Sequence, residues 1–168
     1  MRVMFRMATT VVPLTAALWG CGKDDDGGGL GDEADLRMYR SAITPIVEEV
    51  SSIDSVVAAR AYNSAGTLAT AENLNDVFVG ARPQLLETLV ALDRIEPPAT
   101  LLAMHEQIRA LIVLRLDAYA LVIDGYTRQD ESLYQEAEEK LADANTLIPG
   151  LNDRLCAIDR AIDATFEC

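Results

Sequence analysis

An apolar repeat in the last quarter of the chain constrains the fold more than any other feature. Between residues 131 and 164, apolar side chains recur at steps of three and four without a break: Tyr134, Ala137, Leu141, Ala144, Ile148, Leu151, Leu155, Ile158 and Ile162. This period places them all on one face of an α-helix. Such a face has to be buried against other elements. Because the period continues through Pro149-Gly150, we expect a kink there and not a chain reversal.

Three earlier segments show the same helical period, and no segment alternates apolar and polar residues as a strand does. We therefore expect further helices over about 33–62, 70–94 and 99–127, with the apolar repeat over about 131–164 as the fourth. The connections between them are short. Helices of this length joined by short loops must lie antiparallel to their neighbours, so the sequence predicts an all-α, up-down-up-down four-helix bundle with kinks at prolines.

The expected helix boundaries follow from residues with specific capping preferences. Thr70 and Asp130 are expected N-caps, because their side-chain oxygens can accept hydrogen bonds from backbone N–H groups of the first turn. Gly66, in "NSAG" (63–66), is expected to end the first helix in a left-handed conformation. Pro45 either kinks the first helix or follows a Thr44 cap at the start of a new one. Two consecutive prolines in "EPPAT" (96–100) predict a stiff corner.

The first 20 residues have the pattern of an export signal. Arg2 and Arg6 precede a short apolar run over residues 7–19, which is shorter than the roughly 20 residues that a membrane-spanning helix requires. The run ends in Leu18-Trp19-Gly20-Cys21, which resembles the lipobox of bacterial lipoproteins, although Trp19 is larger than usual for that position. The resemblance implies cleavage before Cys21 and lipidation of its thiol. The alternative is an ordinary signal peptide that leaves Cys21 as a free or paired thiol.

The residues after Cys21 are expected to form a tether. Residues 21–35 are rich in glycine and aspartate and offer little to bury, so we expect disorder there, followed by a helical domain over 36–168. The three acyl chains that the family carries would anchor the domain stably at a membrane. The residue directly after the cysteine is Gly22. An aspartate at this position would resemble the inner-membrane retention signal of enterobacterial lipoproteins. We therefore expect the outer membrane, with the domain on its periplasmic or surface face.

The charge of the chain excludes several classes of partner. Removal of residues 1–20 leaves 12 basic and 27 acidic side chains, a formal charge of −15. A field of this sign repels nucleic acids and anionic lipid head groups. We therefore expect no nucleic-acid partner and no membrane contact apart from the lipid on Cys21.

Two cysteines remain in the helical domain. In an oxidising compartment, Cys156 and Cys168 could form one disulfide. A straight helix would separate them by roughly 18 Å, so they can pair only if the chain turns back after about Ala164. Free thiols or an intermolecular link through Cys168 are the alternatives.

The third helix carries two polar residues within its apolar stripe. His105, the only histidine, is either a haem or metal ligand or a partly buried group that donates a hydrogen bond near the "PPAT" corner (97–100). One histidine cannot supply the paired ligands of a di-iron bundle, and we expect no metal and no cofactor. Arg115 needs an anionic partner if it is buried, and Asp54 on the first helix is the expected one, with Glu48 or Glu49 as alternatives. These residues define a candidate buried polar site.

The expected function is non-enzymatic. The sequence contains no nucleophile elbow, P-loop or HExxH motif. Leu114 and Leu121 lie one heptad apart, away from the main stripe, and form a candidate contact face for a second copy or another envelope protein. The sequence thus predicts a lipid-anchored interaction or scaffolding module of the cell envelope. The alternative is a bundle that binds a small molecule or haem.

Overall fold

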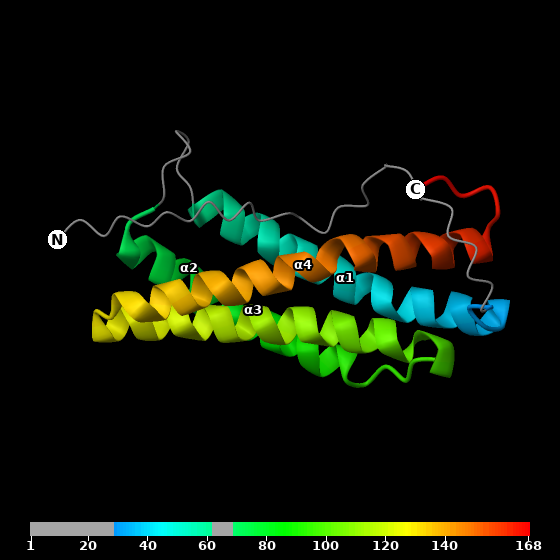
Figure 1. The fold of residues 1–168 in the computed structure, drawn as a ribbon, viewed down its shortest axis with the longest axis horizontal. Coiled ribbons are helices and arrows are strands. Elements are labelled where there is room, and N and C mark those ends of the chain that lie inside the picture. The colour runs from blue at the N-terminus through cyan, green and yellow to red at the C-terminus, as the bar shows by residue number, and fades with distance from the viewer. Residues whose placement is uncertain (1–28, 62–68) are drawn as a thin grey trace.

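The computed structural model describes residues 29–61 and 69–168, and within these ranges the secondary structure is entirely helical. The elements are α1 (Glu33–Ala61), α2 (Ala71–Leu92), the short 3-10 helix η1 (Ala99–Leu101), α3 (Leu102–Arg128) and α4 (Glu131–Ile162). Successive α-helices run in opposite directions along the long axis (Figure 1). Each packs against the next in the chain, and α1 also contacts α4. The predicted all-α four-helix bundle is confirmed.

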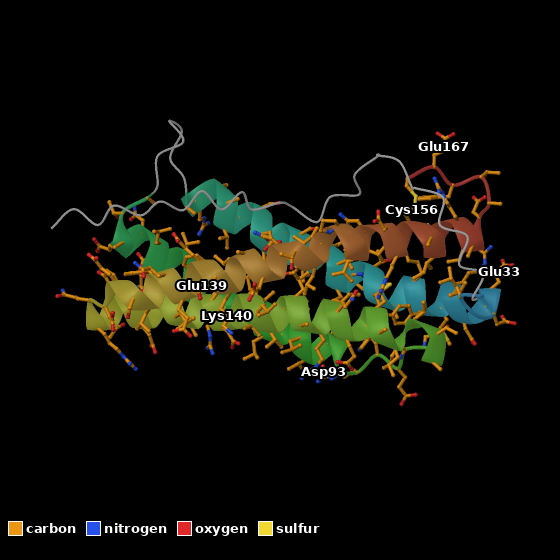
Figure 2. All side chains as sticks on the ribbon, viewed as in Figure 1. Glu33, Asp93, Glu139, Lys140, Cys156 and Glu167 are labelled. Carbon is orange, nitrogen blue, oxygen red and sulfur yellow. A yellow bond between two sulfur atoms is a disulfide. The ribbon has the colours of Figure 1, made fainter. Side chains whose placement is uncertain are left out.

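The bundle is held together by the apolar stripes that the sequence predicts. Ile43, Leu85, Ile112 and Ile158, one from each α-helix, are 0% exposed and lie in the same core. Acidic side chains such as Glu33 and Glu139 are exposed on the outside (Figure 2). At about 25 cal/mol per Å² of buried apolar surface, this core is the main stabilising contribution.

The prolines do not divide the helices. Pro45, Pro83 and Pro149 each lie inside one uninterrupted helix. The alternative of a new helix capped by Thr44 is therefore wrong: the Thr44 hydroxyl instead donates to the carbonyl of Arg40 at 2.7 Å. Kinks at these prolines remain predictions.

Both predicted N-caps are present. The side chain of Thr70 accepts a hydrogen bond from the backbone N–H of Asn73, and that of Asp130 accepts one from Ser132. The hydrogen bonds from Ser132 lower the pKa of Asp130. The turn between α3 and α4 is tight, because a Cβ on Gly125 would lie only 3.2 Å from the carbonyl oxygen of Asp130. Glycine at this position lets the two helices approach closely.

The expectations for the N-terminal segment fall mainly outside the described residues. These include the signal peptide (1–20), Cys21 and the tether up to residue 28, and also Gly66. Residues 33–35, which fall within both the expected tether (21–35) and the expected first helix (about 33–62), form the first turn of α1. Leu30 packs against the core, and its carbonyl accepts a hydrogen bond from the Thr100 hydroxyl at 2.6 Å. The end of the tether is thus attached to the bundle.

Candidate functional site

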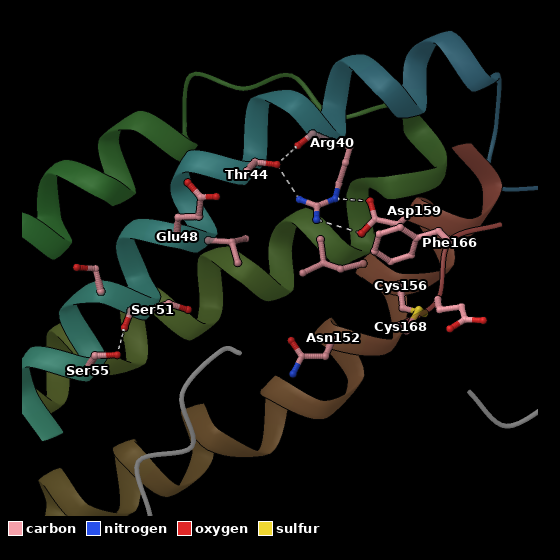
Figure 3. Close-up of a pocket in the computed structure, with 14 residues that line it drawn as sticks. Arg40, Thr44, Glu48, Ser51, Ser55, Asn152, Cys156, Asp159, Phe166 and Cys168 are labelled. Atoms are coloured by element: carbon pink, nitrogen blue, oxygen red, sulfur yellow. Dashed lines mark hydrogen bonds and ion pairs between the residues drawn. A yellow bond between two sulfur atoms is a disulfide. The ribbon is translucent and has the colours of Figure 1, made fainter. Parts of the chain in front are cut away.

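A cleft of about 550 Å³ lies between α1, α4 and the C-terminal tail that follows α4 (Figure 3). One wall is the face of α1 from Arg40 to Ser55, and the opposite wall is the face of α4 from Asn152 to Asp159. The tail adds Phe166, Glu167 and Cys168. A volume of this size is typical of sites for small organic ligands.

One end of the cleft is closed by an ion pair between α1 and α4. The guanidinium of Arg40 donates two hydrogen bonds to the carboxylate of Asp159, at 2.7 and 3.0 Å, and a third to the Thr44 hydroxyl at 2.7 Å. The Arg40 and Asp159 side chains are only 27% and 16% exposed. This paired geometry fixes both side chains and joins the two helices.

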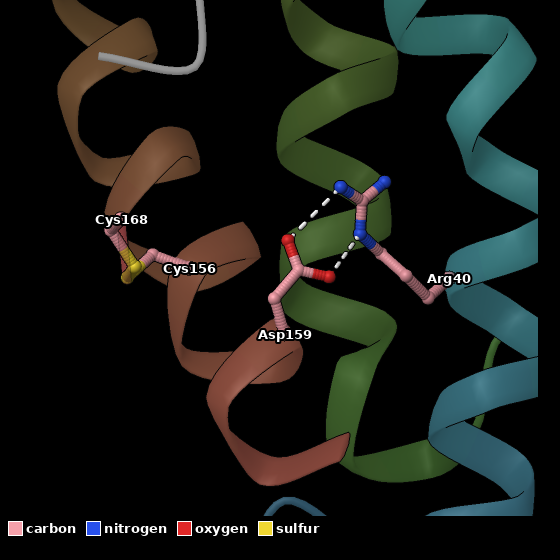
Figure 4. Close-up of a disulfide and its surroundings, with 4 residues drawn as sticks. All are labelled: Arg40, Cys156, Asp159 and Cys168. Carbon is pink, nitrogen blue, oxygen red and sulfur yellow. Dashed lines mark hydrogen bonds and ion pairs between the residues drawn. A yellow bond between two sulfur atoms is a disulfide. The ribbon is translucent and has the colours of Figure 1, made fainter. Parts of the chain in front are cut away.

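A disulfide between Cys156 and Cys168 attaches the tail to α4 (Figure 4). The Cα atoms of the two cysteines are 5.8 Å apart, because the helix ends at Ile162 and the chain then turns back. Asp163 makes this turn: its carboxylate accepts from the backbone N–H of Thr165 and its carbonyl from that of Phe166, both at 2.9 Å. The bonds from Thr165 lower the pKa of the Asp163 carboxyl. The reversal that the pairing requires is therefore built into the tail.

The candidate buried polar site is divided between two places. Arg115 and Asp54, each 2% exposed, form an ion pair between α3 and α1. Glu48 and Glu49, the alternative partners, are exposed. Burial raises the pKa of Asp54 to about 6, although the charge of Arg115 opposes this shift. The pair lies inside the core and fixes the position of α1 against α3.

His105 lies ten residues before Arg115 on the same helix and has a different partner. Its Nδ1 is 3.3 Å from the hydroxyl of Tyr39 on α1, and both side chains are buried. Burial lowers the pKa of His105 and raises that of Tyr39 to about 12. A neutral imidazole that accepts from the Tyr39 hydroxyl fits both shifts. His105 is thus a hydrogen-bonded histidine, but it is buried and its partner is Tyr39 of α1, not the corner at residues 97–100.

The candidate contact face of α3 is half-buried. Leu114 and Leu121 pack against the core. A more exposed apolar stripe lies on α2, where Val79, Leu86 and Val90 are 49%, 46% and 45% exposed. This stripe was not predicted. Its signal in the sequence is a step of seven and then four residues between apolar positions outside the core-facing set of α2.

Neither a metal site nor a membrane-spanning helix is found among the described residues. No three His, Cys, Asp or Glu side chains come together there in a way that could hold a metal ion. Within the same ranges, no helix combines the length and the apolar character needed to cross a membrane.

Comparisons of the chain with protein-family models, curated proteins and solved structures found no significant match. The function is therefore inferred from the residues of the chain itself.

Proposed function

We propose that the protein is a non-enzymatic, lipid-anchored module of the cell envelope that associates with a second copy of itself through α2. Lipidation of Cys21 would hold it at a membrane, and the absence of an aspartate at position 22 favours the outer membrane. The strongly acidic charge argues against nucleic acids as partners. The observation that carries the association is the exposed apolar stripe on α2.

The stripe has the spacing of a helix–helix contact. Val79, Leu86 and Val90, with Pro83 between them, fall within about 60° on a helix with 3.6 residues per turn. They occupy alternating d and a positions of about two heptads. Large exposed apolar residues that gather on one face are typical of interaction sites.

Charges beside the stripe favour a second copy in parallel orientation. Arg82 and Glu87 flank it on opposite sides, and neither forms an ion pair with another described residue. Their five-residue separation is that of the g and e positions that pair between parallel helices. Two chains anchored in one membrane face would meet in this orientation. Confinement to the membrane raises their effective concentration, which suits a contact as small as this one.

The anchor is tested by Cys21→Ser in the producing organism. We expect the wild-type protein in the membrane fraction and the variant in the soluble fraction, with a mature N-terminal peptide of the wild type that carries acyl chains in mass spectrometry. Membrane association of the variant, or an unmodified Cys21, would contradict the anchor.

The α2 contact is tested by charge reversal. Arg82→Glu or Glu87→Arg alone should reduce cross-linking between membrane-bound copies, and the double reversal should restore it, because the pair is re-formed with opposite polarity. Leu86→Glu should abolish cross-linking, whereas Val56→Glu, at an equally exposed apolar position on α1, serves as the matched control. Equal cross-linking in all variants, or a different envelope protein cross-linked at α2, would refute self-association.

A further inference from the structure

Several hydrogen-bond donors on the α1 side of the cleft between α1 and α4 are already used within the protein. The Arg40 guanidinium is bound to Asp159 and Thr44. The hydroxyl protons of Thr44 and Ser55 are donated to backbone carbonyls of α1, at 2.7 and 2.8 Å. These hydroxyl oxygens keep lone pairs that can still accept. A ligand that brings donors of its own can therefore bond with this wall.

The charges of the cleft favour a cationic ligand. Its lining holds one basic and three acidic side chains, a formal charge of −2. Arg40 and Asp159 neutralise each other. Glu48 on α1 and Glu167 on the tail remain, and neither forms a hydrogen bond or ion pair with another described residue. An anionic ligand would be repelled, whereas a cation would be attracted.

Apolar groups complete the cleft. Val47 of α1, Leu155 of α4 and the ring of Phe166 lie along it, together with the Cys156–Cys168 disulfide. Phe166 is 43% exposed, so its ring is available to a ligand. An apolar lining that carries a few placed polar groups is the usual composition of a small-molecule site.

We propose that this cleft binds a small organic cation, a protonated primary amine on an apolar body. The Glu48 and Glu167 carboxylates would supply the negative charge that attracts the ammonium group, and the apolar body would contact the apolar side chains of the cleft, Val47, Leu155 and Phe166. This inference depends neither on the lipid anchor nor on the α2 contact, which lies on another helix.

The charge preference is tested with three probes that share one apolar body: hexylammonium, hexan-1-ol and hexanoate. Each is titrated into the full-length protein with its disulfide intact, in a non-ionic detergent, with titrations into detergent alone subtracted. We expect hexylammonium to bind most tightly and hexanoate most weakly. The binding of hexylammonium should weaken as salt is added, since partly exposed charges are screened. Amide NMR shifts should be confined to residues 44–55, 152–159 and the tail.

The position of the charge is tested by isosteric substitutions. Glu48→Gln and Glu167→Gln should each weaken hexylammonium binding, because each removes one negative charge from the cleft, and should leave hexan-1-ol binding unchanged. The double variant should bind hexylammonium more weakly than either single variant. Glu136→Gln, which removes the same charge from an exposed position at the opposite end of α4, is the matched control. Equal affinity for the three probes, no binding at millimolar concentration, or an equal effect of Glu136→Gln would overturn the proposal.

Discussion

The ion pair between Arg115 and Asp54 is the residue-scale feature with the largest energetic consequence. Both side chains are buried, so both lose hydration on folding, and only their mutual contact compensates. Such a pair contributes little net stability but makes each partner indispensable to the other.

Removal of one partner should therefore cost much more than removal of both. We expect Asp54→Leu to lower the free energy of unfolding by about 3–5 kcal/mol, because the guanidinium is left buried without an acceptor. Asp54→Leu combined with Arg115→Met should recover most of this loss, and urea unfolding followed by circular dichroism measures both. A double variant no more stable than the single one would show that the pair has a positive net contribution.

The pKa of Asp54 also predicts a dependence on pH. The carboxyl is protonated below about pH 6 in the folded chain and only below its ordinary value near 4 when unfolded. Between these values the folded state binds more protons, so the contribution of Asp54 to stability falls as the pH rises through this window. Relative to Asp54→Asn, which cannot ionise but can still accept from Arg115, the wild type should lose stability as the pH rises from about 4 to about 6. A constant difference between the two proteins would contradict the shift.

Residue patterns predicted some of these contacts and not others. Arg115 stands out because a charge interrupts an apolar stripe, and Asp54 is the acid nearest the seam of the facing helix. The pair of Arg40 with Asp159 has no such signal, because both residues also suit an exposed helix surface. The two residues are 119 positions apart in the chain, so their contact arises only when α1 and α4 are placed side by side.

At the scale of elements, helix ends were predictable where a cap acts through neighbouring residues. The observed starts of α2 and α4 follow directly after Thr70 and Asp130. The end of α3 differs from the usual glycine cap, since Gln129 adopts the left-handed conformation, with φ of 56°. The 3-10 turn η1 was not predicted, because only its packing distinguishes it from the first turn of α3.

The cap of α2 gives a prediction at this scale. Thr70→Ala removes the oxygen that accepts from the Asn73 N–H and should cost about 1 kcal/mol of stability. Thr70→Ser keeps the oxygen and is the matched control. Thermal unfolding of the three proteins measures the difference, and equal melting temperatures for Ala and Ser would show that the hydroxyl contributes nothing.

For the whole molecule, the disulfide fastens the tail to the bundle. Cross-linking residues 12 positions apart restricts the unfolded chain, an effect of about 3 kcal/mol in the chain-entropy model. We expect the double variant Cys156→Ser, Cys168→Ser to lose about this much stability. It should also show sharper, more mobile tail resonances in NMR, whereas unchanged stability and tail dynamics would indicate that packing alone holds the tail.

The cleft itself could not be predicted from the sequence. Its walls come from opposite ends of the chain, and none of its residues forms a recognisable motif. The turn at Asp163, which brings Phe166 and Glu167 to the cleft, depends on side-chain hydrogen bonds that helical periodicity does not report.

The covalent attachment of the tail also sets an order of events. Thiols stay reduced where proteins are synthesised in a cytosol, so a newly made chain can assemble its four helices there but cannot bond Cys156 to Cys168. Before this bond forms, the tail, which makes the third side of the proposed amine-binding cleft, is not covalently attached to α4. If the chain is exported as we propose, oxidation of this single pair of sulfur atoms would complete the proposed amine site only after export.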